Sequence, residues 1–243
     1  MTGLPGWRPT TARGILLAAA ALLVAAPCAE AAARLVSVRA ADGTLLSGAL
    51  FEPDHRPAPA VVLVHMLTRS RGDWNDAAER LRRGGFFALA IDLRGHGQSA
   101  GAGGVPENLS ALVQDVRAAV AFLAAHGDVL AGRIGIAGAS LGANLAVLAA
   151  AAEPSVRSLA LLSATTDYRG VRTEAALRKV TRPVLLVAGT NDAYAVRSAK
   201  VLAGTEASRE VDLRDGAGHG TVMLQRYPDL ADRLVDWFRR TLL

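Results

Sequence analysis

Residues 138–142 read Gly-Ala-Ser-Leu-Gly, between an apolar run, Ile134 to Ala137, and an alanine-rich segment, Leu145 to Ala152. The run has the length of a buried strand, and the segment is typical of a buried helix. A strand that turns into a helix at G-x-S-x-G is a nucleophile elbow, because small residues around the serine permit the sharp turn. The turn lifts the hydroxyl clear of the sheet, so Ser140 is the candidate nucleophile.

Strand-like and helix-like segments alternate on both sides of this turn. Strands are predicted at Ala60 to Val64, Phe87 to Ile91, Ser158 to Leu162, Val184 to Ala188 and Glu210 to Leu213, and the first two are expected to be buried. Helices are predicted at about Trp74 to Arg83, Glu107 to Ala125, Thr173 to Lys179, Tyr194 to Leu202 and Asp229 to Thr241. Two alternating runs around Asp42-Gly43 predict a hairpin. The pattern therefore predicts an α/β fold, a doubly wound and mostly parallel sheet flanked by helices, with an N-terminal antiparallel hairpin.

The composition is that of a globular protein, with 51% hydrophobic and 20% charged residues in a chain of 243. The formal net charge is +5, but the arginines are scattered among acidic residues rather than gathered in blocks. This distribution indicates a solvated surface, so we expect no nucleic-acid partner. No cluster of residues has the spacing of a metal site, and we expect neither a metal nor another cofactor.

The N-terminal segment has the features of a secretory signal peptide. Arg8 and Arg13 precede an apolar run from residue 15 to residue 26, and Ala29-Glu30-Ala31 provides an A-x-A cleavage site. The run is too short to span a bilayer comfortably. We therefore expect residues 1–31 to be removed and residues 32–243 to form the exported, periplasmic or secreted protein of a bacterium, without a stable membrane span. The alternative is an uncleaved N-terminal anchor.

A serine hydroxyl needs a neighbouring base, and that base needs a carboxylate that fixes its tautomer. His219 is the best candidate base, because it lies on a loop with glycines on both sides directly after the last predicted strand. His55 lies in a proline-rich loop and His126 lies at a helix end. His65 closes a strand, and His96 comes before the elbow in the sequence.

Asp192 is the candidate acid, because it follows the predicted strand Val184 to Ala188. The resulting order is Ser140, Asp192, His219, which is the order in which an elbow serine, its acid and its base follow one another along the chain. Asp167, after the preceding strand, is the second candidate for the acid.

Attack by Ser140 on a carbonyl group would create an oxyanion that needs hydrogen-bond donors. One donor is expected to be the backbone N–H of Leu141, at the start of the helix after the elbow. The other is expected in the loop after the strand Ala60 to Val64, at Leu67, with Met66 as the less favoured choice.

Several segments resemble the α/β-hydrolase superfamily, and within it the small bacterial members without a lid that are close to the dienelactone-hydrolase-like group. They are the strand into His65, residues 92–99 (Asp-Leu-Arg-Gly-His-Gly-Gln-Ser), the elbow, residues 189–192 (Gly-Thr-Asn-Asp) and Gly218-His219. The resemblance covers nearly all of residues 34–243 and implies that the segment around His96 is structural. The chain departs from the family in having Met66 where a glycine is usual, and its serine nucleophile differs from the cysteine of dienelactone hydrolases proper.

The resemblance implies a catalytic domain that cleaves carboxylic esters through an acyl-enzyme intermediate, with a small-molecule ester as substrate. The link from Ser163 to Arg182 is too short for the helical cap of many relatives, which favours an open cleft. Side chains expected at its border are Met66, Leu67, Tyr168, Tyr194, Val222 and Met223, and we take Met66, Tyr168 and Tyr194 as substrate-binding residues.

Three alternatives remain open at this point. One is a serine peptidase or amidase of the same fold, and another is a non-catalytic binding protein on a hydrolase scaffold. The third treats residues 95–100 (Gly-His-Gly-Gln-Ser-Ala) as a dinucleotide-binding loop, which is disfavoured because no helix opens within that segment.

Overall fold

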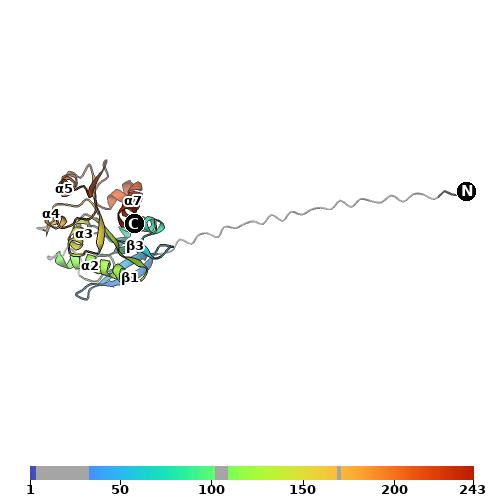
Figure 1. Ribbon diagram of the computed structural model, residues 1–243, viewed down its shortest axis with the longest axis horizontal. Coiled ribbons are helices and arrows are strands. Elements are labelled where there is room, and N and C mark those ends of the chain that lie inside the picture. Colours follow the sequence, from blue (N-terminus) through green and yellow to red (C-terminus); the bar gives the residue numbers. More distant parts are fainter. Residues whose placement is uncertain (4–32, 102–108, 169–170) are drawn as a thin grey trace. The chain divides into compact units, whose positions relative to one another are not determined.

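The computed structural model describes residues 1–3, 33–101, 109–168 and 171–243 (Figure 1). The contacts of the chain divide it into Met1–Glu30 and Ala31–Leu243, and the helices and strands of the described residues all belong to the second part. Apart from residues 1–3, the expected signal peptide lies outside the described residues. Among the residues that are described, no helix has the length and apolar character needed to cross a bilayer.

Eight strands form one sheet in the order β1-β2-β4-β3-β5-β6-β9-β10 among the described residues. The strands are β1 (Arg34–Arg39), β2 (Leu45–Phe51), β3 (Ala58–Val64), β4 (Phe87–Ile91), β5 (Val129–Ala139), β6 (Val156–Leu162), β9 (Val184–Gly189) and β10 (Arg209–Arg214). β2 pairs antiparallel with β1 and β4, and the other neighbours are parallel. The predicted mostly parallel sheet with an N-terminal antiparallel hairpin is confirmed.

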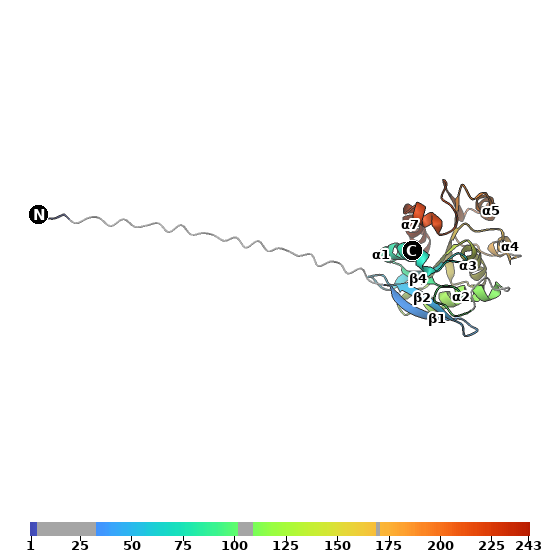
Figure 2. The same cartoon turned by 180° about the vertical axis from the view of Figure 1, so that it is seen from behind.

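Helices cover both faces of the sheet. They are the 3-10 helix η1 (Arg71–Trp74) and the α-helices α1 (Asn75–Arg83), α2 (Ser110–Ala124), α3 (Leu141–Ala152), α4 (Thr173–Leu177), α5 (Ala193–Ala203), α6 (Val222–Arg226) and α7 (Asp229–Leu242). The neighbouring helices α1 and α7 cover one face (Figure 2), and α2, α3 and α5 cover the other. Side chains of β5 alternate between the two cores, because successive residues of a strand point to opposite faces.

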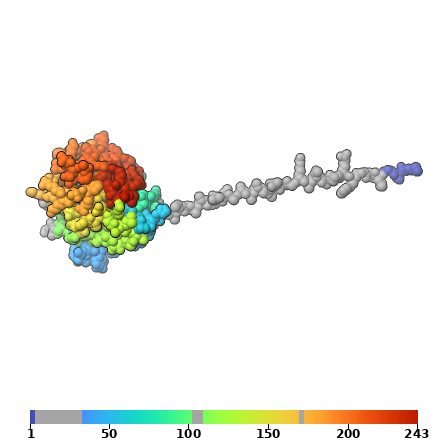
Figure 3. Space-filling view, in the orientation of Figure 1, coloured from blue at the N-terminus to red at the C-terminus, as the bar shows by residue number. Residues whose placement is uncertain are grey.

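Small residues in the sheet let α7 approach it closely. A Cβ atom on Gly135 of β5 would meet the ring of Phe238 at 2.5 Å, so only glycine leaves room for that ring. The indole N–H of Trp237 donates a 2.9 Å hydrogen bond to the carbonyl of Leu159 on β6. Figure 3 shows the C-terminal residues, in red, beside the green part of the surface. Arg133 donates a 2.6 Å hydrogen bond to the carbonyl of Leu242. The predicted apolar face of the last helix is buried here.

Two regions differ from the sequence prediction. The link between β6 and β9 contains a small antiparallel ribbon, β7 (Asp167–Tyr168) and β8 (Val171–Arg172), in addition to the expected helix, α4. The segment before α7 contains α6, which was not predicted. A strand of two residues and a helix of five are too short to show a periodic pattern. The predicted start of α2, Glu107, lies outside the described residues, and the helix is described from Ser110.

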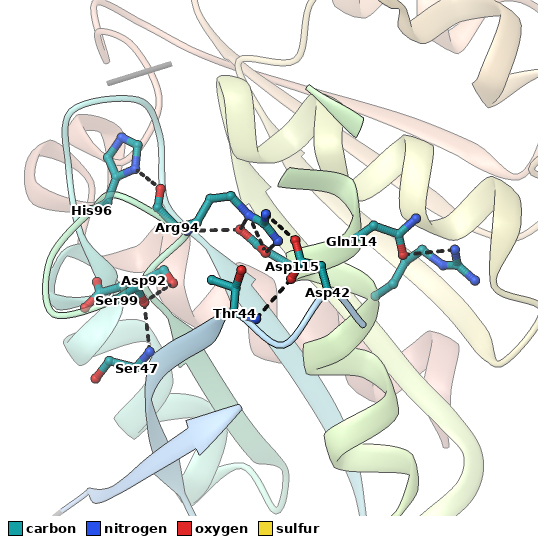
Figure 4. Close-up of polar contacts among 10 residues, drawn as sticks. Asp42, Thr44, Ser47, Asp92, Arg94, His96, Ser99, Gln114 and Asp115 are labelled. Atoms are coloured by element: carbon teal, nitrogen blue, oxygen red, sulfur yellow. Dashed lines mark hydrogen bonds and ion pairs between the residues drawn. The ribbon is translucent and has the colours of Figure 1, made fainter. Parts of the chain in front are cut away.

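The loop of residues 92–99 connects β4 to the N-terminal hairpin (Figure 4). The hydroxyl of Ser99 donates to the carbonyl of Asp92 at 2.6 Å and accepts the N–H of Ser47, on β2, at 2.8 Å. The buried carboxylate of Asp92 accepts the backbone N–H of Arg71 at 2.7 Å and that of Gln98 at 3.0 Å, and it pairs with the Arg71 guanidinium. These contacts explain why the segment has a structural role, as the resemblance implies.

Arg94 extends this network to α2 (Figure 4). Its guanidinium forms a two-pronged contact with the buried carboxylate of Asp115, with hydrogen bonds of 2.6 to 3.0 Å. It also donates to Asp42 in the hairpin turn at 2.7 Å. Hydrogen bonds from Arg94 and from the backbone of Thr44 hold the pKa of Asp42 well below its usual range. One guanidinium therefore connects the hairpin turn, the loop after β4 and α2.

Candidate active site

Ser140 lies at the turn between β5 and α3, with backbone angles of φ 51° and ψ −114°. These angles are strained for a residue with a side chain. A Cβ atom on Gly138 would collide with the carbonyl of Gly142, and one on Gly142 would collide with the carbonyls of Val64 and His65. Glycine is thus required on both sides of the serine, which is the steric reason for the predicted G-x-S-x-G elbow.

Two hydrogen bonds position Ser140. Its backbone N–H donates to the carbonyl of Leu162, at the end of β6, at 2.8 Å. Its hydroxyl lies 2.7 Å from Nε2 of His219, which comes from the loop after β10. The strained backbone is therefore held by the neighbouring strand, while the hydroxyl faces the imidazole.

His219 connects Ser140 to Asp192, because its Nδ1 lies 2.5 Å from Oδ2 of Asp192. A carboxylate only accepts hydrogen bonds, so we assign the imidazole proton to Nδ1, which leaves the lone pair of Nε2 facing the serine hydroxyl. Asp192 is also the N-cap of α5, where its Oδ1 accepts the N–H of Ala195 at 3.0 Å. The structure brings the three predicted residues together, and the imidazole contacts Asp192 rather than the second candidate, Asp167 of β7.

The loop of His219 is held by its neighbours. The N–H of Gly218 donates to the side-chain oxygen of Asn191 at 2.9 Å, and the N–H of Gly220 donates to the hydroxyl of Ser163 at 3.0 Å. Both glycines have positive φ angles, 89° and 60°, a conformation that residues with a Cβ rarely adopt. The glycines on both sides of the histidine thus allow the loop to turn back toward Ser140.

The first predicted oxyanion donor is well placed by its position in the helix. Leu141 is the first residue of α3, so its backbone N–H has no acceptor within that helix. The positive end of the helix dipole adds to its attraction for an anion.

The second predicted donor, Leu67, is oriented through His65. The N–H of Leu93 donates to Nε2 of His65 at 3.0 Å, so the ring proton lies on Nδ1, which donates to the carbonyl of Met66 at 2.7 Å. In a trans peptide the C=O and the following N–H point in opposite directions, so the N–H of Leu67 points away from His65. Burial lowers the pKa of the His65 imidazole and favours this neutral form. The role of both donors stays a prediction.

The predicted substrate-binding residues have different environments. Met66 is half-buried, and its sulfur would lie 2.5 Å from a Cβ atom on Gly220, so it packs against the loop of His219. Tyr168 is half-buried against the core, while Tyr194 is exposed, with its hydroxyl 3.4 Å from the carbonyl of Asp167. Met223, expected at the border of the cleft, is wholly buried in the core, and that expectation is wrong.

A cavity of about 530 Å³ lies away from this site, and Ser140, Asp192 and His219 do not line it. Its lining includes Phe51, Arg71 and Asp92. Because the Arg71 guanidinium and the Asp92 carboxylate pair with each other, the cavity offers no unpaired charge from these two groups. Within the described part of the chain, no group of His, Cys, Asp and Glu side chains could hold a metal ion.

Sequence reasoning missed three residues that support the site. Ser163 accepts the N–H of Gly220, and the hydroxyl of Thr221 donates to Asp73 at 2.5 Å. Ser163 could have been noticed because it follows β6 at the edge of the sheet where functional groups gather. Nothing in the sequence pattern connects Thr221 to Asp73.

Comparisons with known proteins find likenesses to hydrolases over part of this chain. The family described as "Serine aminopeptidase, S33" matches residues 55–175, which include Ser140 and end before Asp192 and His219. A monoacylglycerol lipase of Mycolicibacterium smegmatis is 32% identical over 114 residues, which are 47% of this chain and 40% of the lipase. A probable 2-oxo-3-(5-oxofuran-2-ylidene)propanoate lactonase of Bradyrhizobium sp. is 29% identical over 179 residues, 66% of this chain and 72% of the lactonase.

Solved structures share the fold over most of the chain. A dienelactone hydrolase from Anabaena variabilis has a TM-score of 0.71 and 21% identity, covering 87% of this chain and 98% of its own. An α/β hydrolase from Penicillium sp. has a TM-score of 0.76 and 15% identity, covering 86% of this chain and 99% of its own. The sheet order, the glycine-flanked turn at Ser140 and these likenesses lead to one conclusion: the chain has the fold of the α/β hydrolases.

Proposed function

We propose that this protein is a serine hydrolase that cleaves carboxylic esters with Ser140, His219 and Asp192. The observation that carries the proposal is the chain of hydrogen bonds from the Ser140 hydroxyl to Nε2 of His219, at 2.7 Å, and from Nδ1 of His219 to Asp192, at 2.5 Å. Serine, base and acid in this order of contact form the arrangement that activates a hydroxyl for attack.

The reaction would proceed in two acyl-transfer steps. His219 takes the proton of Ser140 as the oxygen attacks the ester carbonyl, and Asp192 stabilises the imidazolium that forms. The N–H groups of Leu141 and Leu67 would hold the oxyanion, each contributing about 3 kcal/mol to the lowering of the barrier. His219 then protonates the leaving alcohol and activates a water molecule that releases the acid.

We favour an ester as the substrate because several proteins with a similar sequence or fold are named as enzymes that cleave esters or lactones. A lipase, a lactonase and an esterase of Pyrococcus furiosus are among the proteins that this chain resembles. We expect a small-molecule ester in an open site, because β7, β8 and the short α4 form the described part of the link between β6 and β9. Met66, Tyr168 and Tyr194 are the side chains proposed to contact it.

Export of the protein is a second part of the proposal. The charged start, apolar run and A-x-A site of residues 1–31 motivate it. Expression of the full chain in a bacterium, followed by fractionation and N-terminal sequencing, tests it. A mature N-terminus at Ala32 in the periplasm or medium is expected, and an uncleaved chain in the membrane fraction would favour the anchor instead.

Labelling of the active serine tests the catalytic proposal without a guess about the substrate. The purified protein is treated with a serine-directed fluorophosphonate, and the modified peptide is identified by mass spectrometry. We expect stoichiometric labelling at Ser140 that is lost in His219→Ala, and loss of turnover without loss of thermal stability in Ser140→Ala. A folded protein that is not labelled, or a fully active Ser140→Ala variant, would overturn the proposal.

A matched pair of substrates separates the two kinds of hydrolysis. The family that matches the chain is described as a serine aminopeptidase, so amide cleavage is the second candidate. An ester and an amide with the same acyl group and the same chromophore are compared, and we expect turnover of the ester to be the faster by kcat/KM. Faster turnover of the amide would favour the peptidase.

A further inference from the structure

We infer that Asp73 is a positioning residue that joins the loop of Leu67 to the loop of His219. The inference rests on the proposed function, and two hydrogen bonds to one carboxylate oxygen carry it. Oδ2 of Asp73 accepts the hydroxyl of Thr221 at 2.5 Å and Nε of Arg69 at 2.8 Å. Thr221 lies two residues after His219, and Arg69 lies two residues after Leu67. A single atom of η1 thus contacts both loops of the site.

On one side, the contact reaches the predicted oxyanion donor through a turn. The N–H of Arg69 donates to the carbonyl of Met66 at 3.3 Å, and that carbonyl belongs to the same peptide as the N–H of Leu67. Thr68, inside the turn, has a positive φ of 60°, so the turn is strained and depends on its contacts. The side chain of Arg69, held by Asp73, fixes one end of this turn, and His65 holds the other.

On the other side, the contact reaches the candidate base. Thr221 is buried, so its hydroxyl is shielded from water and donates its hydrogen bond to Asp73 instead. The N–H of Val222 donates to the carbonyl of His219 at 3.3 Å, which closes the loop just behind the imidazole. A shift of Thr221 would therefore move the backbone from which the imidazole extends.

The two contacts differ in strength. The side chain of Asp73 is 12% exposed and that of Arg69 is 40% exposed, so water weakens their ion pair. Water does not compete for the hydrogen bond from the Thr221 hydroxyl, because Thr221 is buried. The bond from Thr221 to Asp73 is therefore the main connection, and its loss should have the larger effect.

Loss of this bond should change the rate of the chemical step more than substrate binding. Transition-state stabilisation requires the oxyanion donors and the imidazole in one geometry, and an error of about 1 Å can cost up to 100-fold in rate. Neither Thr221 nor Asp73 is among the side chains proposed to contact the substrate. Thr221→Val should therefore lower kcat and leave KM nearly constant, the pattern of an interaction that acts in the transition state.

The experiment uses the full chain and turnover of p-nitrophenyl acetate as the probe. Thr221→Val removes the hydroxyl at constant volume, Thr221→Ser keeps it, and Thr241→Val makes the same change on α7, where the hydroxyl bonds Ser158 at 2.8 Å. We expect about 10-fold lower kcat with KM within about twofold for Thr221→Val, recovery to within about threefold of the wild type in Thr221→Ser, and wild-type kcat in Thr241→Val.

A double-mutant cycle tests whether the effects come from the hydrogen bond between Thr221 and Asp73 rather than from other contacts of these residues. Asp73→Ala and Thr221→Val are measured singly and together, and we expect their losses in kcat to be clearly less than multiplicative, because each substitution removes the same hydrogen bond. Amide hydrogen exchange in residues 216–224 gives a readout independent of turnover, and it should speed up in Thr221→Val but not in Thr241→Val. If Thr221→Val does not fold, Asp73→Ala is judged by kcat and by hydrogen exchange in the same way.

The outcomes separate the two proposals. Wild-type kcat and wild-type exchange in Thr221→Val, in a protein with Ser140-dependent turnover, would overturn the positioning role alone. Multiplicative losses in the cycle would also overturn it. A wild-type protein without Ser140-dependent turnover would instead contradict the proposed function, and the exchange data would then decide whether Asp73 holds the loop.

Discussion

The backbone N–H of Gly220 donates a 3.0 Å hydrogen bond to the side-chain hydroxyl of Ser163, 57 positions earlier in the chain. Ser163 is fully buried and has a positive φ of 53°. Its neighbour Leu162 accepts the N–H of Ser140 at 2.8 Å. Two consecutive residues at the end of β6 therefore hold both the candidate nucleophile and the loop of the candidate base, so their relative position depends on this strand end.

Substitutions of Ser163 should separate the hydrogen bond from the backbone strain. Ser163→Ala leaves the N–H of Gly220 without its partner in a buried place, which should lower the free energy of unfolding by about 1–3 kcal/mol. Ser163→Gly loses the same bond but relieves the strain of the positive φ, so it should be more stable than Ser163→Ala by about 1 kcal/mol. Urea unfolding measures both. A glycine variant less stable than the alanine variant would contradict the account of strain.

The glycine after the serine should tolerate no larger side chain. Gly142→Ala would push a Cβ atom into the carbonyls of Val64 and His65, at the end of β3. We expect the free energy of unfolding to fall by about 1–3 kcal/mol, because the close-packed backbone must shift. Turnover should fall as well, since the displaced strand end precedes the loop of Leu67.

A matched control for this change is Gly127→Ala, because a Cβ atom there meets nothing within 4 Å. That variant should keep its free energy of unfolding to within about 0.5 kcal/mol. Equal stability of the two variants, measured by urea unfolding, would mean that the turn after Ser140 has room for a methyl group after all.

The burial of His65 predicts a pH dependence of stability. Burial lowers the pKa of the folded imidazole, whereas in the unfolded chain it should titrate near its ordinary value, about 6.5. As the pH falls through that value, the unfolded chain binds a proton that the folded protein does not. The stability contribution is therefore complete above about pH 7 and is lost as the pH decreases toward the lowered pKa of the folded state.

Urea unfolding between pH 5 and pH 7.5 measures this dependence. His65→Asn keeps a donor near the carbonyl of Met66 but does not titrate, so the slope of stability against pH should be smaller than in the wild type. His55→Gln, at an exposed position, is the control and should keep the wild-type slope. An unchanged slope in His65→Asn would show that other groups cause the dependence.

Much of the fold could be predicted because its signals are local. The five residues of β4 form a continuous apolar run that is buried on both faces, and the predicted bounds are the observed ones. The elbow at Ser140 and the glycines around His219 are also local features, and the order of the elements placed them at one edge of the sheet.

The rest depended on contacts that leave no local signal. The ribbon β7–β8 is too short for a periodic pattern, and the bond from Thr221 to Asp73 joins positions 148 residues apart. Met66 illustrates the same limit on the side-chain scale. Its place after β3 suggested a contact with substrate, which stays a prediction, whereas its packing against Gly220 joins two loops and could not be predicted from the sequence.

The two oxygens of Asp192 have separate tasks, and this permits a last prediction. Oδ2 contacts His219 and Oδ1 caps α5. Asp192→Asn should keep the cap, because asparagine caps helices as well as aspartate does, but it should favour the wrong imidazole tautomer and lower kcat by about 10⁴-fold. Asp192→Ala should lose the cap as well and about 1 kcal/mol of stability.

Measurements of kcat and of the free energy of unfolding on the same preparations separate these effects. Asp167→Asn, at the other candidate acid, is the control, because the imidazole of His219 contacts Asp192 instead. If Asp192 is the acid, this control keeps kcat to within about threefold while Asp192→Asn is nearly inactive. The reverse result would assign the acid to Asp167 and leave Asp192 as a helix cap, because the cap alone does not require a carboxylate.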